Sequence, residues 1–136
     1  MRFFTFFATL ATAGLLWLAP AQAQNSDIEA VIGAQIDSFL KDDFETAFTY
    51  AAPNIKEIFR TPERFGVMVQ RGYPMVHRPA EVIFKELREE EGTLQQYVSI
   101  MDSQGQYYIA RYSMTQIDGS WQISGVSIER SPAVGV

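Results

Sequence analysis

The chain has 136 residues, contains no cysteine, and carries 16 acidic against 11 basic residues, which gives a net charge of −5. The absence of cysteine excludes a disulfide framework, a thiol nucleophile and a zinc–thiolate site. An acidic chain without a basic cluster argues against nucleic acid and anionic membrane as partners, and neither is expected.

The first segment, residues 1–23, has the three-part pattern of a secretory signal peptide. Met1-Arg2 supplies a positive start, an uncharged apolar run follows, and Ala21 and Ala23 occupy the small-residue positions that a signal peptidase reads. We therefore expect cleavage after Ala23.

An uncleaved membrane anchor is the alternative interpretation of this segment. A spanning helix needs about 20 apolar residues, whereas the run from Phe3 to Leu18 is shorter and is followed by Pro20. We therefore expect a single domain over residues 24–136. Its expected location is periplasmic or secreted, without membrane association after cleavage.

The first helix of the mature chain is predicted to begin at Ser26. Ser26 can cap the helix, and Glu29, three residues later, can reach back in a capping box. Apolar residues then recur at helical spacing and should form one buried face. That face comprises Ile28, Ile32, Ile36, Phe39 and Leu40, and the polar face comprises Glu29, Gln35 and Asp37.

A second helix should follow Asp42 and Asp43, which interrupt the first helix and can cap the next one. Pro53 is expected to stop this second helix. Its apolar stripe would consist of Phe44, Ala47, Phe48 and Ala51.

Two further helical segments are predicted before residue 73. One is a short turn over Asn54–Phe59. The other begins at Thr61-Pro62-Glu63, where threonine can cap, proline suits the first helical position and glutamate complements the helix dipole. Gly72 is a natural stop. The core-facing residues of the second segment would be Phe65, Met68 and Val69.

Four strands are predicted after residue 80, because the hydrophobic period changes from helical to alternating. They cover residues 81–87, 94–101, 106–117 and 120–130, with turns at 89–92, 102–105 and 118–119. Asp118-Gly119 is the strongest hairpin signal. Helices followed by an antiparallel meander predict an α+β fold, with the helices packed on one face of a curved four-stranded sheet. The open end of such a cone is a natural pocket.

The last predicted strand has a break in its alternation. Trp121 and Ile123 point to one side, whereas Val126 and Ile128 point to the other. A bulge at Gly125 would let all four face the core.

Two segments carry a resemblance to a known family. TPERFGVMVQRGYPMVHRPAEVIF, from Thr61 to Phe84, and DGSWQISGV, from Asp118 to Val126, resemble an exported bacterial family catalogued as domain of unknown function 4864. The order of elements and the ending DGSWQISGVSIE resemble the cone-shaped fold of the nuclear transport factor 2-like superfamily. The resemblance implies a fold and an exported location. It implies no activity, because that superfamily contains isomerases, dehydratases and hydrolases as well as binding and scaffold domains.

The lone histidine, His77, lies between Pro74 and Pro79 in the stretch RGYPMVHRPAEV. One interpretation is a base near neutral pH. Its acidic partner is not evident, since Glu81 is the nearest downstream acid and the acidic residues of the helices are expected on solvated faces. The other interpretation, which we prefer, is a stiff segment at the rim of the cone. No catalytic residue is assigned beyond the candidate His77.

Tyrosines are concentrated on the second and third predicted strands. Alternation places Tyr108 and Tyr112 on one face of the third strand and Tyr107 and Arg111 on the other. One pair would line a pocket with aromatic walls and a polar anchor, unless the tyrosines simply suit half-buried strands. The residues predicted to line a ligand pocket are Tyr73, Met75, His77, Tyr97, Tyr108, Tyr112, Arg111 and Trp121.

No metal or other cofactor is expected. The acidic run Glu89-Glu90-Glu91 cannot converge on one ion because its three side chains are consecutive, and a single histidine does not make a transition-metal site. The leading hypothesis is a non-catalytic module that binds a small apolar or aromatic ligand or a partner protein. The alternatives are an isomerase or dehydratase of the ketosteroid-isomerase type, using His77 or a pocket tyrosine, and a homodimer formed through the exposed sheet face.

Overall fold

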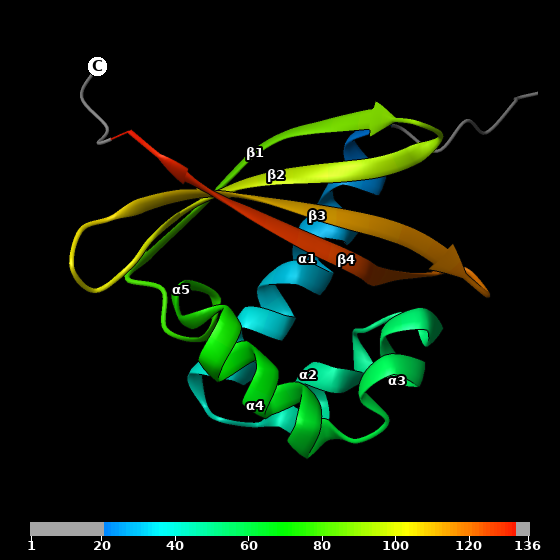
Figure 1. Cartoon of the computed structure of the whole chain (residues 1–136). Helices are drawn as coiled ribbons and strands as arrows, with labels where there is room; N and C mark the ends of the chain where they lie inside the picture. Colours follow the sequence, from blue (N-terminus) through cyan, green and yellow to red (C-terminus); the bar gives the residue numbers. More distant parts are fainter. Residues whose placement is uncertain (1–20, 133–136) are drawn as a thin grey trace, which may run out of the picture.

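The computed structural model describes residues 21–132, with side chains from Gln24 onward, and helices precede a four-stranded antiparallel sheet (Figure 1). The predicted α+β class is therefore confirmed. The predicted signal peptide falls on residues 1–23 and, apart from the backbone of 21–23, lies outside the described residues.

Helix α1, Ala21–Leu40, differs from its prediction at its start and on two of its faces. The helix runs through Ser26 without a break, so the capping box predicted there was wrong. Gln35 is only 3% exposed although it was assigned to the polar face, and Leu40 is 45% exposed although it was assigned to the core. Gln35 lies seven residues after Ile28, which is two helical turns, so it shares the buried face. The predicted residues Ile28, Ile32, Ile36 and Phe39 are buried.

Helix α2, Phe44–Thr49, begins as predicted, because the Asp43 carboxylate accepts the Thr46 backbone N–H at 3.1 Å. Pro53 was wrongly predicted to stop this helix. It is the first residue of α3, Pro53–Phe59, where a missing N–H costs nothing.

The link between α2 and α3 runs alongside the last strand. The Ile123 N–H donates to the Tyr50 carbonyl at 2.9 Å, and the Ala52 N–H donates to the Ile123 carbonyl at 2.8 Å. This short bridge covers part of the edge of the sheet and ties the short helices to it.

Helix α4, Pro62–Gly72, begins and ends at the residues predicted for it. The Thr61 hydroxyl accepts the Arg64 N–H at 3.3 Å, and the helix ends at Gly72. A single helical turn, α5, Pro74–His77, follows immediately. The predicted rigid segment around His77 is thus a short helix that begins at a proline.

The sheet has strand order β1-β2-β3-β4, and its strands are β1, Glu81–Glu90, β2, Thr93–Met101, β3, Tyr107–Ile117, and β4, Ser120–Ser131. Two of the three hairpins close with two left-handed residues each. The φ angles are 53° and 78° at Glu91-Gly92, and 50° and 81° at Asp118-Gly119. This is the turn geometry that matches the twist of the strands.

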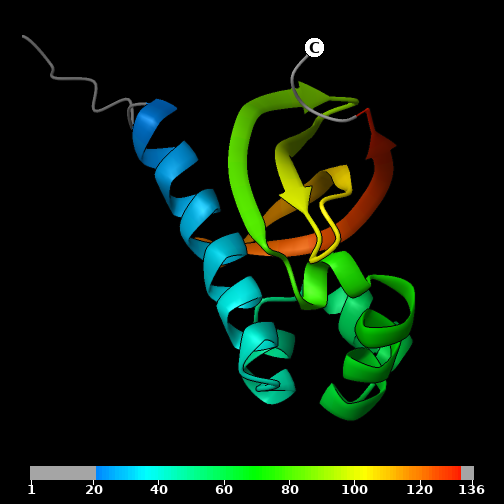
Figure 2. The ribbon, with the colours of Figure 1, turned by 90° about the vertical axis from the view of Figure 1, so that its left-hand side faces the viewer.

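Two bulges bend the outer strands. In β4, Ser113 pairs with Gly125 and Met114 with Ile123, so Ser124 is the extra residue. The predicted bulge is confirmed, and it lies one residue before Gly125, the position at which it was expected. Ile123 is buried, and the half-buried Trp121, Val126 and Ile128 pack against the same core. A second bulge, in β1, was not predicted. It lies between Phe84 and Leu87, and bulges increase strand bending, which is visible in β1 and β4 (Figure 2).

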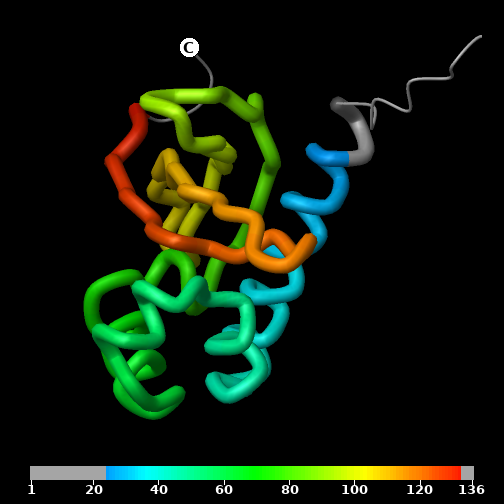
Figure 3. Tube along the Cα trace, turned by 90° about the vertical axis from the view of Figure 1, so that its right-hand side faces the viewer, coloured from blue at the N-terminus to red at the C-terminus, as the bar shows by residue number. Residues whose placement is uncertain are grey.

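The core lies between α1 and one face of the sheet. Alternate residues of β2 and β3 share this face, namely Val98, Ile100, Ala110, Tyr112 and Met114. Views from opposite sides show α1 along the sheet and the short helices α2–α5 gathered at one end (Figures 2 and 3). Within residues 21–132, no helix is both long enough and apolar enough to cross a membrane.

Candidate functional site

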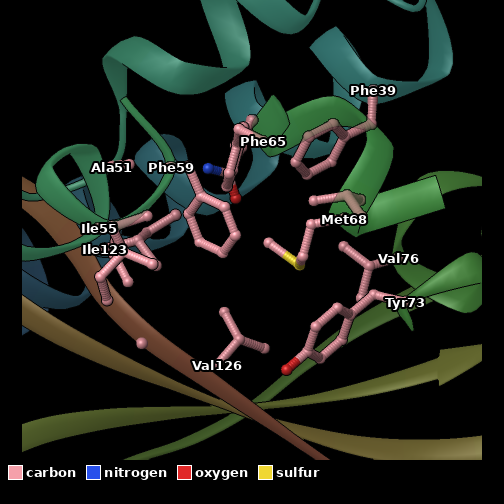
Figure 4. A pocket seen from close by; sticks show the side chains of 14 residues that line it. Phe39, Ala51, Ile55, Phe59, Phe65, Met68, Tyr73, Val76, Ile123 and Val126 are labelled. Atoms are coloured by element: carbon pink, nitrogen blue, oxygen red, sulfur yellow. The ribbon is translucent and has the colours of Figure 1, made fainter. Parts of the chain in front are cut away.

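A cavity of about 380 Å³ lies where the short helices meet α1 and β4. Its aromatic walls are Phe39, Phe59, Phe65 and Tyr73. Aliphatic and thioether side chains complete the apolar lining, and they come from Ala51, Ile55, Ile58, Met68, Val69, Val76, Ile123 and Val126. The elements that supply these residues are far apart in the sequence, so the cavity is a product of tertiary packing (Figure 4).

Phe65 anchors the aromatic wall. Its ring centroid lies 5.8 Å from that of Phe39, 5.9 Å from that of Phe59 and 5.2 Å from that of Phe48. Rings packed at these distances hold one another in place. Figure 4 shows Phe59, Phe65 and Tyr73 around the open space, with Met68 extending into it. The aromatic wall is therefore preformed. Met68 has a flexible side chain, so the shape of the cavity can adapt to a ligand on that side.

The cavity reaches the surface beside α3. Ile58 lines it and is nevertheless 68% exposed, which is unusual for a large apolar residue. The neighbouring Phe59 is only half-buried. The lining is therefore open to solvent at Ile58.

Two polar side chains, Gln35 of α1 and Tyr73, line the cavity, and among the described lining residues no side chain is charged at neutral pH. Tyr73 lies between α4 and α5, and its hydroxyl points toward the Val126 side (Figure 4). Gln35 donates from Nε2 to the Ala47 carbonyl at 3.1 Å. Sequence reasoning missed Gln35, although its spacing from Ile28 and Phe39 signals the buried face.

Of the eight side chains predicted to line a ligand pocket, Tyr73 lines this cavity. Met75 of α5 is half-buried and packs against the core. Trp121 is half-buried near the β3–β4 turn and also packs against the core. The remaining five, described next, lie in the sheet or in the α5 turn.

Tyr108 and Tyr112 share one face of β3, as their alternation predicted, and that face is the one turned to the core. The Tyr108 hydroxyl donates to Asp102 Oδ2 at 3.4 Å. Tyr112 is fully buried, and its hydroxyl has no hydrogen-bond partner among the described residues. Burial raises the pKa of the Tyr112 hydroxyl, so this group stays neutral and serves as packing.

Tyr97 and Arg111 lie on the opposite face of the sheet, in a polar cluster. The Tyr97 hydroxyl donates to Glu90, whose other carboxylate oxygen lies 3.5 Å from Arg111 Nη1. The Arg88 guanidinium lies over the Tyr97 ring, 4.7 Å from its centroid. These residues are on the face considered for a homodimer, and they are turned away from the cavity.

His77 has an acidic partner that sequence reasoning did not find. Its Nε2 lies 2.7 Å from Asp42 Oδ1, and its ring stacks on Phe44 with centroids 5.9 Å apart. Arg78 Nη2 donates to both oxygens of the same carboxylate at 2.9 Å. Hydrogen bonding from His77, and the bond and charge of Arg78, hold the pKa of the Asp42 carboxyl below its usual value.

These three residues join the turn after α1 to the end of α5, since His77 is the last residue of α5 and Arg78 its C-cap. Arg78 Nη1 also donates to the Phe39 carbonyl at 2.6 Å, so it caps the end of α1. The Asp42 carboxylate thus binds one guanidinium nitrogen of Arg78 and the His77 ring nitrogen at the same time. The cavity lining does not include any of the three residues. We therefore assign the trio a structural role.

Metal ligands do not gather in the described part of the chain. Among residues 24–132, no three side chains of His, Asp or Glu lie close enough to hold an ion. The consecutive glutamates at the β1–β2 turn have different roles. Glu90 accepts a hydrogen bond from the Tyr97 hydroxyl, whereas Glu91 has a left-handed backbone conformation in the turn.

The chain matches the model of one protein family. That family is described as a domain of unknown function (DUF4864), and the match covers residues 21–136, so the chain belongs to this family. Comparison with curated proteins finds no match to the chain.

Proposed function

We propose that this family member is a small exported binding domain that holds an apolar small molecule in the cavity between α1, α3, α4, α5 and β4. The observation that carries the proposal is the cavity itself, about 380 Å³ with a lining of aromatic and aliphatic side chains. Ligand pockets in proteins have volumes of roughly 300–1,000 Å³ and are mostly apolar, with a few polar groups that fix orientation.

The same geometry favours binding over acid–base catalysis. A general base must lie within hydrogen-bond reach of its target. His77 is engaged with Asp42 outside the cavity lining, and Asp42 is also held by Arg78. An isomerase of the ketosteroid-isomerase type would have to use the Tyr73 hydroxyl, which has no charged neighbour in the described lining. A binding role requires no such group.

We further infer that the domain is a cone of the nuclear transport factor 2-like type, with the cavity at its open end. This inference is supported by the order of helices before a meander, by the packing of the core on one sheet face, and by the gathering of α2–α5 at one end. The export proposal is supported by the pattern of residues 1–23 alone.

Binding can be tested with N-phenyl-1-naphthylamine, whose fluorescence rises in apolar surroundings. We expect saturable binding to the mature protein. Val126→Phe should weaken it about ten-fold or more, because the larger side chain occupies the cavity. Ile128→Phe is the matched control, since Ile128 lies on the same strand and face but is not part of the lining. It should bind the probe as the wild type does.

Two outcomes would overturn the proposal. One is the absence of saturable binding to a folded wild-type protein. The other is equal binding by the Val126→Phe and Ile128→Phe variants, which would place the probe elsewhere. A folded variant can be recognised by its denaturation midpoint. A bound ligand should also raise the free energy of unfolding of the wild type, by about 2.7 kcal/mol at one hundred times its Kd.

A further inference from the structure

Gln35 is a buried amide in an otherwise apolar stripe. It lies on α1 between Ile32 and Phe39, is 3% exposed, and lines the cavity. A buried amide costs free energy unless its polar atoms are hydrogen-bonded. Gln35 Oε1 is not one of the buried side-chain oxygens that lack a partner, so it is accessible and can accept a hydrogen bond from a molecule in the cavity.

Among residues 24–132, a hydrogen-bond partner is found for only one end of this amide. Nε2 donates to the Ala47 carbonyl at 3.1 Å, which sets the orientation of the amide, because the reverse orientation would place two oxygens together. No hydrogen bond described for residues 24–132 uses Gln35 Oε1 as its acceptor. The Ala47 carbonyl also accepts the Tyr50 N–H, at 3.3 Å, so it keeps a donor without Gln35.

We propose that Gln35 Oε1 accepts a hydrogen bond from the bound molecule, so that the cavity selects apolar alcohols or phenols over hydrocarbons. This inference rests on the proposed binding function. The acceptor requires a donor on the ligand, and the aromatic and aliphatic walls require the rest of that ligand to be apolar. A carboxylate is disfavoured, because it would meet a second acceptor with no cation among the described lining residues.

Three probes of one shape separate donor recognition from apolar burial. 2-Naphthol carries a donor, 2-methoxynaphthalene carries only an acceptor, and naphthalene carries neither. Titration calorimetry on the wild type should show 2-naphthol binding about three- to ten-fold more tightly than the other two, which is the contribution of one neutral hydrogen bond. 2-Naphthoate should bind more weakly than naphthalene.

Gln35→Met removes the acceptor at nearly constant volume and should abolish this preference while retaining naphthalene binding. Tyr73→Phe is the control, since it removes the other polar group of the lining and should preserve the preference. If Gln35→Met does not fold, the wild-type probe series together with Tyr73→Phe still tests the inference, because a preference that survives Tyr73→Phe leaves Gln35 as the polar side chain of the described lining.

The outcomes distinguish this inference from the function on which it rests. If no naphthalene probe and no N-phenyl-1-naphthylamine binds, the proposed binding function is overturned. If the three naphthalenes bind equally, the cavity binds apolar molecules without donor recognition, and the inference alone is overturned. A preference that disappears in Tyr73→Phe and persists in Gln35→Met would also overturn it, by assigning the contact to Tyr73.

Discussion

Asp42 adopts a left-handed backbone conformation, with a φ of 53°, at the end of α1. The Asp43 N–H bonds to the Ser38 carbonyl at 2.8 Å and the Asp42 N–H to the Phe39 carbonyl at 3.0 Å, which is a Schellman ending. Glycine is the usual residue at this position. Aspartate tolerates the conformation better than most residues do, and here its carboxylate gains the contacts to His77 and Arg78.

The first prediction concerns the free energy of unfolding at acidic pH. The pKa of the Asp42 carboxyl is lowered in the fold, so its contribution to stability is present above the ordinary value of 3.8 and is lost as the pH falls below it. Urea unfolding of wild type and Asp42→Asn between pH 6 and pH 3 should show the steeper loss in the wild type. Asparagine also tolerates the left-handed conformation, so the turn is retained.

Asp43 does not affect the difference in pH dependence between the wild type and Asp42→Asn. Hydrogen bonds from Thr46 lower the pKa of the Asp43 carboxyl too, but Asp43 is present in both proteins and its contribution cancels in the difference. Parallel profiles for the two proteins would show that the Asp42 contacts add nothing to stability.

At the scale of the elements, α4 and α2 approach one another closely at Gly66. A Cβ atom on Gly66 would lie 2.6 Å from Phe44 Cγ, so the ring lies directly against the α4 backbone. The same ring stacks on His77 and lies 6.3 Å from the Phe39 centroid. The glycine thus lets one aromatic ring join α1, α2, α4 and α5.

The second prediction compares two glycines of α4. Gly66→Ala should lower the free energy of unfolding by about 1–3 kcal/mol, because Phe44 must move in a packed interior. Gly72→Ala is the matched control, since no atom lies within 4 Å of its added Cβ, and it should be neutral or stabilising by up to about 1 kcal/mol. Denaturant midpoints measure both changes. Equal effects of the two substitutions would refute the close approach.

At the scale of the whole molecule, the proposed cleavage after Ala23 would leave the core intact. From Gln24 onward, the first buried residue of α1 is Ile28, so removal of residues 1–23 takes away none of the described core contacts. The helix would lose only its first three residues, Ala21–Ala23, and helix ends contribute little on their own.

The third prediction is therefore a mature chain that begins at Gln24. Intact-mass measurement on the protein from its native host should show this species. Ala23→Leu should block cleavage, because the peptidase reads a small residue there, while Ala13→Leu within the apolar run should not. A mature species that retains Phe3 to Leu18 would contradict the export proposal and indicate an anchored protein.

The sequence by itself determined the features that depend on a few neighbouring residues. Thr61 and Asp43 cap the helices predicted for them, because capping joins residues three positions apart. Asp118-Gly119 closes the predicted hairpin, and the bulge beside Gly125 follows from the break in alternation. These signals act within one turn or one strand, and the α+β class follows from their order.

Only the tertiary structure decided which residues meet across the fold. The partner of His77 lies 35 positions earlier, at Asp42, and no local pattern signals that pairing. Pro53 begins α3 because the segment before it pairs with β4. The cavity joins side chains from α1, α3, α4, α5 and β4, so its lining could not be read from strand alternation, and Tyr73 alone was predicted. The physical reason is that packing, which leaves Leu40 exposed at a position that its spacing assigned to the core, is set by contacts between distant segments rather than by local periodicity.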